Sequence, residues 1–242
     1  MKRSDSRVYC PVLLGLCLLL AACNTKTTQV EKGPDTQDVN FDSLIKTDVG
    51  VVLEIHVREV RTLMRELMVK LYKRNPRELK KSVFPSAEEN IDRLFEQRHG
   101  WNFPELDGKR DIEAIKLTFD EDFKGDRVFA FVSGLTSMLM ASYKYKTEFY
   151  VLDSVDAQSL YNSARNIEIA VWRLGNEYDS NDELFLYSNS LPGEITNLSY
   201  ERIFGKLISL QDTMAIIIAG KTNRTVVKVV QRMVTAVFLP IF

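Results

Sequence analysis

Apolar residues recur at steps of three and four along most of the chain, which is the spacing of an amphipathic α-helix. The clearest run, from Val52 to Lys73, has apolar side chains at Leu53, Val57, Val60, Met64, Leu67, Met68 and Leu71. Asn75-Pro76 ends this helix and begins another, because Asn is a favoured N-cap and Pro suits the first helical position. Ser86 and Glu89 have the spacing of a capping box and open a third helix.

Further helices are expected downstream, separated by loops. They are a short helix from Asp107 to Asp122, a more apolar one from Asp126 to Lys144, one capped near Asp156 and running to Asn176, and two last helices at roughly Ser199–Ala219 and Thr222–Leu239. Gly220 separates the last two, since Gly fits the left-handed position just past a helix end and Thr222 can cap the next helix. Glu148 to Leu152 is either a short strand or the approach to the helix near Asp156, and residues 176–197 are loop-rich. The sequence therefore predicts an all-α, multi-helix bundle of about seven helices with at most one short strand.

Two segments are apolar enough to need a protected environment. Val128 to Tyr143 carries no charge across 16 residues, and Gly134, Ala130 and Ala141 permit close approach of another helix. This segment is shorter than the roughly 20 residues that a membrane-spanning helix needs, so we expect a central buried helix. Residues 226–238 are apolar almost all round, so the last helix should be buried or should face an apolar ligand or partner.

The first 23 residues have the layout of an export signal. Three basic residues precede an apolar run from Pro11 to Leu20, and Leu20-Ala21-Ala22-Cys23 completes the segment. This segment resembles the lipobox of bacterial lipoproteins, and the resemblance covers residues 1–23 only. It implies cleavage before Cys23, a diacylglycerol on the Cys23 sulfur and a further acyl chain on the new amino terminus. A soluble secreted protein with a chance cysteine after its cleavage site is the alternative.

The residue after the cysteine bears on location. In the sorting rule of lipoproteins in two-membrane envelopes, Asp at this position favours the inner membrane, so Asn24 implies the outer membrane, facing the periplasm. Residues 24–40 are polar and broken by Gly33-Pro34, which is typical of a flexible tether. The expected organisation is a signal peptide (1–22), a lipidated cysteine and tether (23–40) and a single helical periplasmic domain (41–242).

Net charge and cysteine content exclude several classes of function. Residues 1–22 carry three basic and one acidic side chain, so the totals of 32 basic and 33 acidic residues become 29 and 32 in the mature chain. A net charge near −3 gives no basic excess for nucleic acid. Cys10 and Cys17 leave with the signal peptide and Cys23 is acylated, which excludes disulfides and thiol chemistry.

Three candidate chemical sites are weak. Residues 215–222 (AIIIAGKT) satisfy the pattern of a phosphate-binding loop, but three isoleucines are too stiff to curl around a phosphate, so we expect no nucleotide. His56 and His99 lack metal-ligand spacing, and residues 179–183 lack the later ligands of a calcium loop, so we expect no metal and no cofactor. No nucleophile motif is present, and the carboxylates offer no reason to choose a catalytic pair.

The helix before Asn176 carries two stripes. Leu160, Ala164, Ile167, Val171 and Leu174 form a core stripe, and Tyr161, Arg165, Glu168 and Trp172 form a second one. Tyr, Trp and Arg are the residue types that dominate interaction hot spots. The second stripe is therefore either a partner- or ligand-facing surface or a satisfied polar seam between helices.

These features predict a lipid-anchored, non-enzymatic envelope lipoprotein. It would be held to the membrane by the acyl chains on Cys23 and would act through protein–protein contacts as a scaffold or accessory subunit. One alternative is a helical carrier with an apolar cavity between the Val128–Tyr143 helix and the last helix. Another is an envelope hydrolase, which would need a cleft with converging carboxylates of perturbed pKa.

Overall fold

The computed structural model describes residues 46–191 and 193–241. Within these ranges the chain forms seven α-helices and no strand, which confirms the all-α prediction. The elements are α3 (Asp48–Arg74), α4 (Pro76–Leu79), α5 (Ala87–Phe95), the 3-10 helix η1 (Pro104–Leu106), α6 (Asp111–Leu117), α7 (Arg127–Ser142), α8 (Ala157–Asn176), α9 (Ser199–Thr222) and the 3-10 helix η2 (Met233–Thr235).

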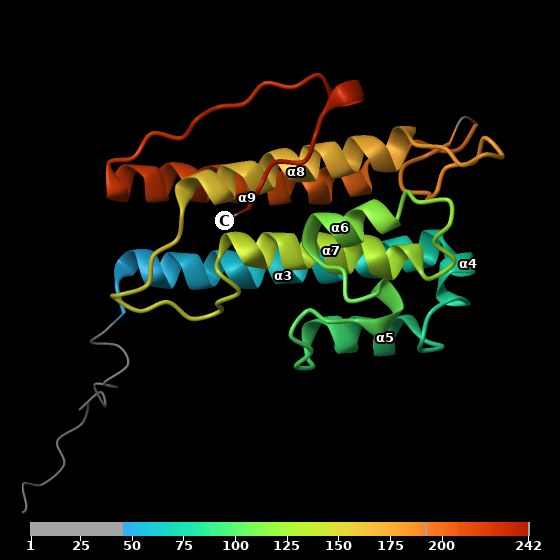
Figure 1. Cartoon of the computed structure of the whole chain (residues 1–242), viewed down its shortest axis with the longest axis horizontal. Coiled ribbons are helices and arrows are strands. Elements are labelled where there is room, and N and C mark those ends of the chain that lie inside the picture. Colours follow the sequence, from blue (N-terminus) through green and yellow to red (C-terminus); the bar gives the residue numbers. More distant parts are fainter. Residues whose placement is uncertain (1–45, 192, 242) are drawn as a thin grey trace, which may run out of the picture. The chain divides into compact units, whose positions relative to one another are not determined.

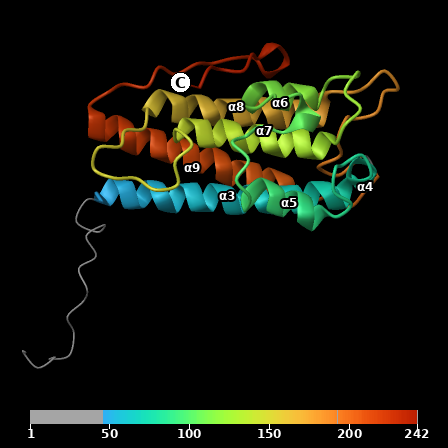
Figure 2. The same ribbon diagram turned by 60° about the horizontal axis from the view of Figure 1, so that its bottom comes forward.

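Four long helices form a bundle. α3 packs against α7 and α9, and α8 packs against the same two helices, so each long helix has two neighbours. Successive long helices run in opposite directions (Figure 1). α6 lies on α7, and α5 lies on α3, as the rotated view also shows (Figure 2). This up-down-up-down arrangement buries the apolar stripe of each helix.

The core follows the predicted stripes. The seven apolar residues expected to face inward on α3 are all buried, as are Leu160, Ala164, Ile167 and Leu174 of α8. Two clusters share the interior. The larger includes Leu67, Phe129 and Phe204, and the smaller, which includes Leu53 and Tyr143, lies where α3 begins and α9 ends.

The charge-free segment is the central helix that its composition predicts. Every residue of α7 except Ala141 is buried. Gly134 allows α6 to approach, because a Cβ at this position would lie 2.7 Å from the backbone nitrogen of Ile115 and 2.9 Å from the carbonyl oxygen of Asp111. The expectation of close helix contact at Gly134 is therefore confirmed.

Hydrogen bonds to the N-cap side chains confirm most of the predicted helix starts. The Ser86 hydroxyl accepts from the backbone N–H of Glu89 at 3.1 Å, and the Asp126 and Asp156 carboxylates cap α7 and α8 in the same way. Asn75 occupies the N-cap position of α4, but its side chain does not cap that helix. The segment near Glu148 forms turns rather than a strand.

The expected helix over residues 107–122 is too long. Only Asp111–Leu117 is α-helical, and Asp107 and Asp111 have left-handed backbone φ values of 53°. At its C-terminal end, the guanidinium of Arg127 donates to the carbonyl oxygens of Leu117, Thr118 and Asp120 at 3.3, 3.0 and 2.8 Å. The Arg127 side chain thus satisfies the backbone acceptors that a longer helix would have used.

The two predicted C-terminal helices are the main error. α9 continues through Gly220 to Thr222 and ends at Asn223, whose φ is 51°. The expected helix Thr222–Leu239 does not form: residues 224–241 are extended apart from η2, and we call them the C-terminal strap. Runs of Val and Thr disfavour a helix, and α8 supplies other partners for this backbone.

α9 also has the length and apolar composition of a membrane-spanning helix. Core helices of soluble domains meet the same criterion. Ile203, Phe204, Leu207 and Met214 of α9 are buried in the two core clusters. The buried half of α9 is accounted for by packing against α3 and α8.

Candidate interaction surface on α8 and the C-terminal strap

The second stripe of α8 lies at the junction of α8, α9 and the strap. Arg165 is its centre: one guanidinium nitrogen lies 3.2 Å from a carboxylate oxygen of Glu168 and 2.6 Å from one of Asp212 on α9. The guanidinium carbon also lies 5.0 Å from the ring centroid of Tyr161. Arg165 therefore joins two helices and stacks on an aromatic ring, as the polar-seam interpretation predicts.

The seam is not fully satisfied. Nε of Arg165 and Oδ1 of Asp212 are buried without a hydrogen-bond partner. Burial raises the pKa of Glu168, while the charge of Arg165 lowers it and that of Asp212 raises it. Two acids thus share one cation in a half-buried position, and two polar atoms of the seam stay unpaired inside the protein.

The first arm of the strap, residues 224–231, is held along α8 by two side chains. The Gln158 amide accepts from the backbone N–H of Val227 at 2.8 Å and donates to its carbonyl oxygen at 3.1 Å. The Tyr161 hydroxyl accepts from the N–H of Val229 at 3.2 Å and donates to its carbonyl at 3.4 Å. The Tyr161 hydroxyl therefore bonds to the main chain of the strap, while its ring contacts Arg165.

The strap then turns at η2 and returns along α8 (Figure 1). Asn166 accepts from the N–H of Leu239 at 2.6 Å and donates to its carbonyl at 2.8 Å, and Asn162 donates to the carbonyl of Pro240 at 2.9 Å. Phe238 and Ile241 pack against the larger core cluster. The second arm, residues 236–241, is therefore anchored by apolar packing as well as by hydrogen bonds.

The sequence did not predict that Gln158, Asn162 and Asn166 bind the strap, although Asn162 and Asn166 were seen to lie beside the second stripe. They follow one another at intervals of four on α8 and so form one row along the helix. Amide side chains can donate and accept at once, so each can pair with both groups of one extended residue. This row of amides beside the aromatic stripe is the sequence feature that could have predicted binding of an extended segment.

Two open cavities flank the strap. The larger, of about 580 Å³, is lined by Trp172, Gly175, Phe204 and Ile208 among others. The smaller, of about 260 Å³, lies beside Tyr161 and Arg165. Glu168 and Met233 line both. The residues of the second stripe thus border a groove that consists of these two cavities. Met233 of the strap lies between them.

The outward side of the strap is apolar. Val227, Val230, Val234 and Val237 are exposed, with Val230 at 96% of its full accessible area. Of the two alternatives expected for this segment, burial is wrong for these four valines, because the segment lies on the outside of α8 rather than within the bundle. The other alternative, an apolar ligand or partner, stays a prediction. Arg224, Lys228 and Arg232 of the strap are exposed as well, so its surface carries both apolar and basic groups.

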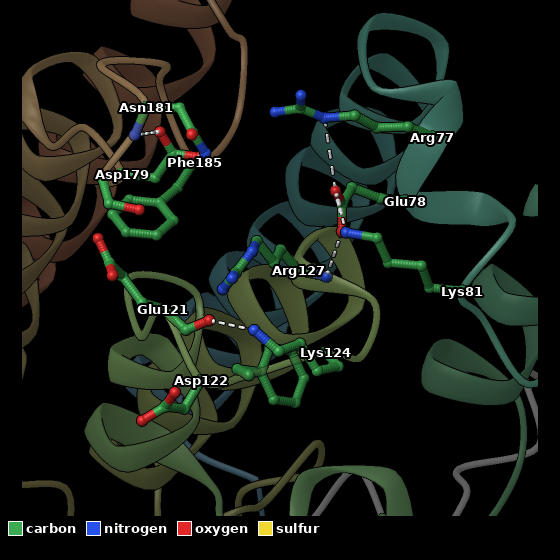
Figure 3. Close-up of a pocket in the computed structure, with 12 residues that line it drawn as sticks. Arg77, Glu78, Lys81, Glu121, Asp122, Lys124, Arg127, Asp179, Asn181 and Phe185 are labelled. Carbon is green, nitrogen blue, oxygen red and sulfur yellow. Dashed lines mark hydrogen bonds and ion pairs between the residues drawn. The ribbon is translucent and has the colours of Figure 1, made fainter.

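A separate polar cleft of about 400 Å³ lies between α4, the turn before α7 and the loop after α8 (Figure 3). At its floor the carboxylate of Glu78, which is buried, accepts from the backbone N–H of Arg127 at 3.0 Å and pairs with Lys81 at 2.8 Å and with Arg77 at 3.6 Å. The buried charge of Glu78 is therefore compensated by two basic side chains at the floor of the cleft.

One carboxylate of the polar cleft has a lowered pKa. The Asp179 carboxylate accepts from the backbone N–H groups of Asn181 and Glu183 in its own loop, and these bonds hold its pKa below the usual range. A general acid needs the opposite shift. Asp126 has a raised pKa, and its carboxylate caps α7 and accepts from Tyr72. It lies next to Arg127, and the charge of Glu78, another residue that lines the cleft, contributes to raising its pKa.

The remaining candidate sites have structural roles. Nδ1 of His99 accepts from the backbone N–H of Trp101 at 2.9 Å, and Nε2 lies 2.9 Å from the Leu94 carbonyl, so both ring nitrogens close the loop. No group of three or more His, Cys, Asp or Glu that could hold a metal occurs in residues 46–191 and 193–241. The residues of the phosphate-loop pattern, 215–222, are helical.

Cys23 and the lipobox fall outside the described residues. Their assignment rests on the sequence resemblance alone. Comparison with protein-family models, curated proteins and solved structures found no match to this chain.

Proposed function

We propose that this protein is a lipid-anchored, non-enzymatic envelope protein that acts through protein–protein contacts made by α8 and the C-terminal strap. The observation that carries the proposal is the exposed apolar strap, which is fixed along the Tyr161/Arg165/Glu168/Trp172 stripe of α8. Acyl chains on Cys23 would hold it to the outer membrane, and the tether would let the bundle reach a partner in the periplasm.

The groove beside the strap supports a contact role. It combines Trp172 and Phe204 with the half-buried carboxylate of Glu168, which pairs with Arg165. Aromatic side chains next to an arginine are typical of interaction hot spots. The carrier alternative was based on a cavity between α7 and a last helix, and residues 224–241 form no such helix.

The anchor can be tested by metabolic labelling with radioactive palmitate. Cys23→Ala should abolish incorporation, because the thiol that receives the diacylglycerol is gone. Cys17→Ala is the matched control and should keep the label, since residue 17 leaves with the signal peptide. Label that persists in Cys23→Ala would refute the lipoprotein assignment.

The contact surface can be tested by filling the groove. A Cβ added at Gly175 meets no atom within 4 Å, and the same holds at Gly220 near the end of α9. Gly175→Arg should place a long side chain in the groove and sharply reduce cross-linking of the protein to its envelope partner in cells. Gly220→Arg adds the same side chain away from the groove and should leave the cross-link intact.

Thermal unfolding of both variants shows whether the bundle is preserved. Equal cross-linking of the two folded variants, or no partner adduct with the unaltered protein, would contradict the proposed contact surface.

A further inference from the structure

On one edge of the strap's first arm the backbone N–H and C=O groups are hydrogen-bonded to α8. On the opposite edge the backbone groups have no partner among the described residues. Both backbone groups of Val227 and of Val229 face α8, where Gln158 and Tyr161 bind them. Alternate residues of an extended chain direct their backbone groups to opposite sides. The N–H and C=O groups of Val226, Lys228 and Val230 therefore point away from α8.

Nothing in the described part of the chain pairs with that outer edge. No backbone–backbone hydrogen bond joins residues 225–231 to any other described residue. Val230 is almost fully exposed and Val227 is 68% exposed. A straight, β-branched edge with unpaired backbone groups is a template for a further strand, and proteins usually protect such edges.

The charge of the strap selects the kind of partner. From residue 221 onward the chain has Lys221, Arg224, Lys228 and Arg232 and no acidic residue. Arg224 lies 3.8 Å from Asp156, whereas Lys228 and Arg232 have no ion-pair partner among the described residues. Pairing of two straps from two copies would bring like charges together, so an acidic strand fits better than a second copy.

The open edge also argues against a lipid surface as the occupant. Backbone N–H and C=O groups without partners are costly in an apolar medium, and lipid tails cannot bond them. A peptide strand satisfies the same groups and can place carboxylates opposite Lys228 and Arg232.

We propose that the outer edge of residues 226–232 binds an extended, acidic and β-branched segment of another protein by strand addition. This inference rests on the proposed contact function and specifies its partner. α8 acts as the rigid support: Gln158 and Tyr161 hold the inner edge, so that the outer edge is extended and ordered before the partner binds. Such preorganisation lowers the entropy cost of association.

The test uses the full chain purified in detergent and a fluorescent peptide of about eight residues made of Val, Thr and Glu, with blocked ends. We expect saturable binding by fluorescence anisotropy and slower deuterium uptake in the proteolytic fragment that covers residues 224–232. The same peptide with Lys in place of Glu should not bind, because it repels the strap. Failure of the Glu peptide to bind would overturn the proposal.

Two pairs of variants separate charge from backbone pairing. Lys228→Glu with Arg232→Glu should weaken binding at least about tenfold, since two attractive pairs become repulsive. Arg202→Glu with Lys206→Glu makes the same charge change on the exposed side of α9 and should have no effect. Val230→Pro should weaken binding because it removes an outward N–H, whereas Val230→Ala keeps that donor and should bind more strongly than the Pro variant.

Other occupants are outcomes of the same experiment. Slower exchange of residues 224–232 caused by phosphatidylglycerol but not by phosphatidylcholine or peptide would assign the edge to an anionic membrane. Self-association that Lys228→Glu with Arg232→Glu strengthens would assign it to a second copy. If the cellular cross-link depends on Gly175 but the peptide does not bind, this inference fails while the contact function stands.

Discussion

Single polar side chains hold this bundle together where its segments meet. The Asn75 amide, which is buried, donates to the carbonyl oxygens of Leu71 and Tyr187 at 2.9 and 2.8 Å and accepts from the N–H of Tyr187 at 2.8 Å. It thus joins the end of α3 to the loop before α9, 112 residues away. Buried backbone groups need such partners, and an amide supplies a donor and an acceptor together.

Asp126 is the buried acid whose charge affects stability. Its carboxylate caps α7 through the N–H of Phe129 at 3.0 Å and accepts from the hydroxyl of Tyr72 at 2.7 Å. Burial raises the pKa of Asp126 to about 6, although both hydrogen bonds lower it. The folded state therefore binds this proton more tightly than the unfolded state, in which the ordinary value is 3.8.

We predict that Asp126→Asn removes a pH-dependent loss of stability. In the unaltered protein the contribution of Asp126 is greatest below pH 3.8 and is lost as the pH rises through about 6. Asn keeps the capping oxygen and carries no charge. The free energy of unfolding of the variant relative to the unaltered protein should therefore rise by about 2–3 kcal/mol between pH 4 and pH 7.

Urea unfolding at several pH values measures this difference. Asp120→Asn changes a carboxylate in the neighbouring exposed turn and serves as the control. A stability difference between Asp126→Asn and the unaltered protein that stays constant with pH would show that the Asp126 carboxyl is not desolvated.

At the scale of the element, the close contact between α6 and α7 depends on a glycine of α7, Gly134, which has no side chain. α6 is only seven residues long, and it is held against the middle of α7 at Gly134. The Ser137 hydroxyl donates to the Gly134 carbonyl at 3.1 Å and accepts from the N–H of Asp111 at 2.7 Å. The short helix is thus fixed by close packing and by a hydroxyl bridge rather than by its own propensity.

Gly134→Ala should destabilise the protein by about 1–3 kcal/mol, because the new methyl group would overlap backbone atoms of α6. Gly205→Ala on α9 is the matched control: its Cβ would meet nothing within 4 Å, and it should stabilise by up to about 1 kcal/mol through helix propensity. Equilibrium unfolding in urea gives both values. Equal effects at the two positions would mean that α6 can move away without cost.

At the scale of the molecule, the C-terminal strap converts a four-helix bundle into a surface with an open edge. Its two arms are held differently. The second arm combines amide bonds with burial of Ala236 and packing of Phe238, whose ring centroid lies 5.1 Å from the guanidinium carbon of Arg173. The first arm has hydrogen bonds to Gln158 and Tyr161 and little apolar burial.

Asn166→Ala should loosen the strap's second arm and speed amide exchange in residues 236–241. Asn166 is buried, so its loss leaves the N–H and C=O of Leu239 without their partner and should cost about 1–3 kcal/mol. Asn176→Ala, at an exposed asparagine whose amide bonds only to the carbonyl of Trp172 on its own helix, is the control. Hydrogen–deuterium exchange followed by mass spectrometry measures amide exchange of residues 236–241 in both variants. Unchanged exchange in Asn166→Ala would contradict an anchoring role for Asn166.

The sequence by itself determined the features that depend on neighbours in the chain. The stripe of α3, the capping box at Ser86, the caps at Asp126 and Asp156 and the buried α7 follow from spacing and local chemistry. The resemblance of residues 1–23 to a lipobox signal rests on the order of residues alone, and acylation of Cys23 stays a prediction.

Only the tertiary structure decided how residues 224–241 are folded and what the α8 stripe contacts. Local pattern predicted a helix from Thr222 to Leu239, and this prediction was wrong. The amides of Gln158, Asn162 and Asn166 favour the extended form by bonding to its backbone. Arg165 likewise met Asp212, 47 positions away, which no spacing rule predicts. Contacts between distant segments decided both, because a helix period describes only which residues share a face and not what that face will meet.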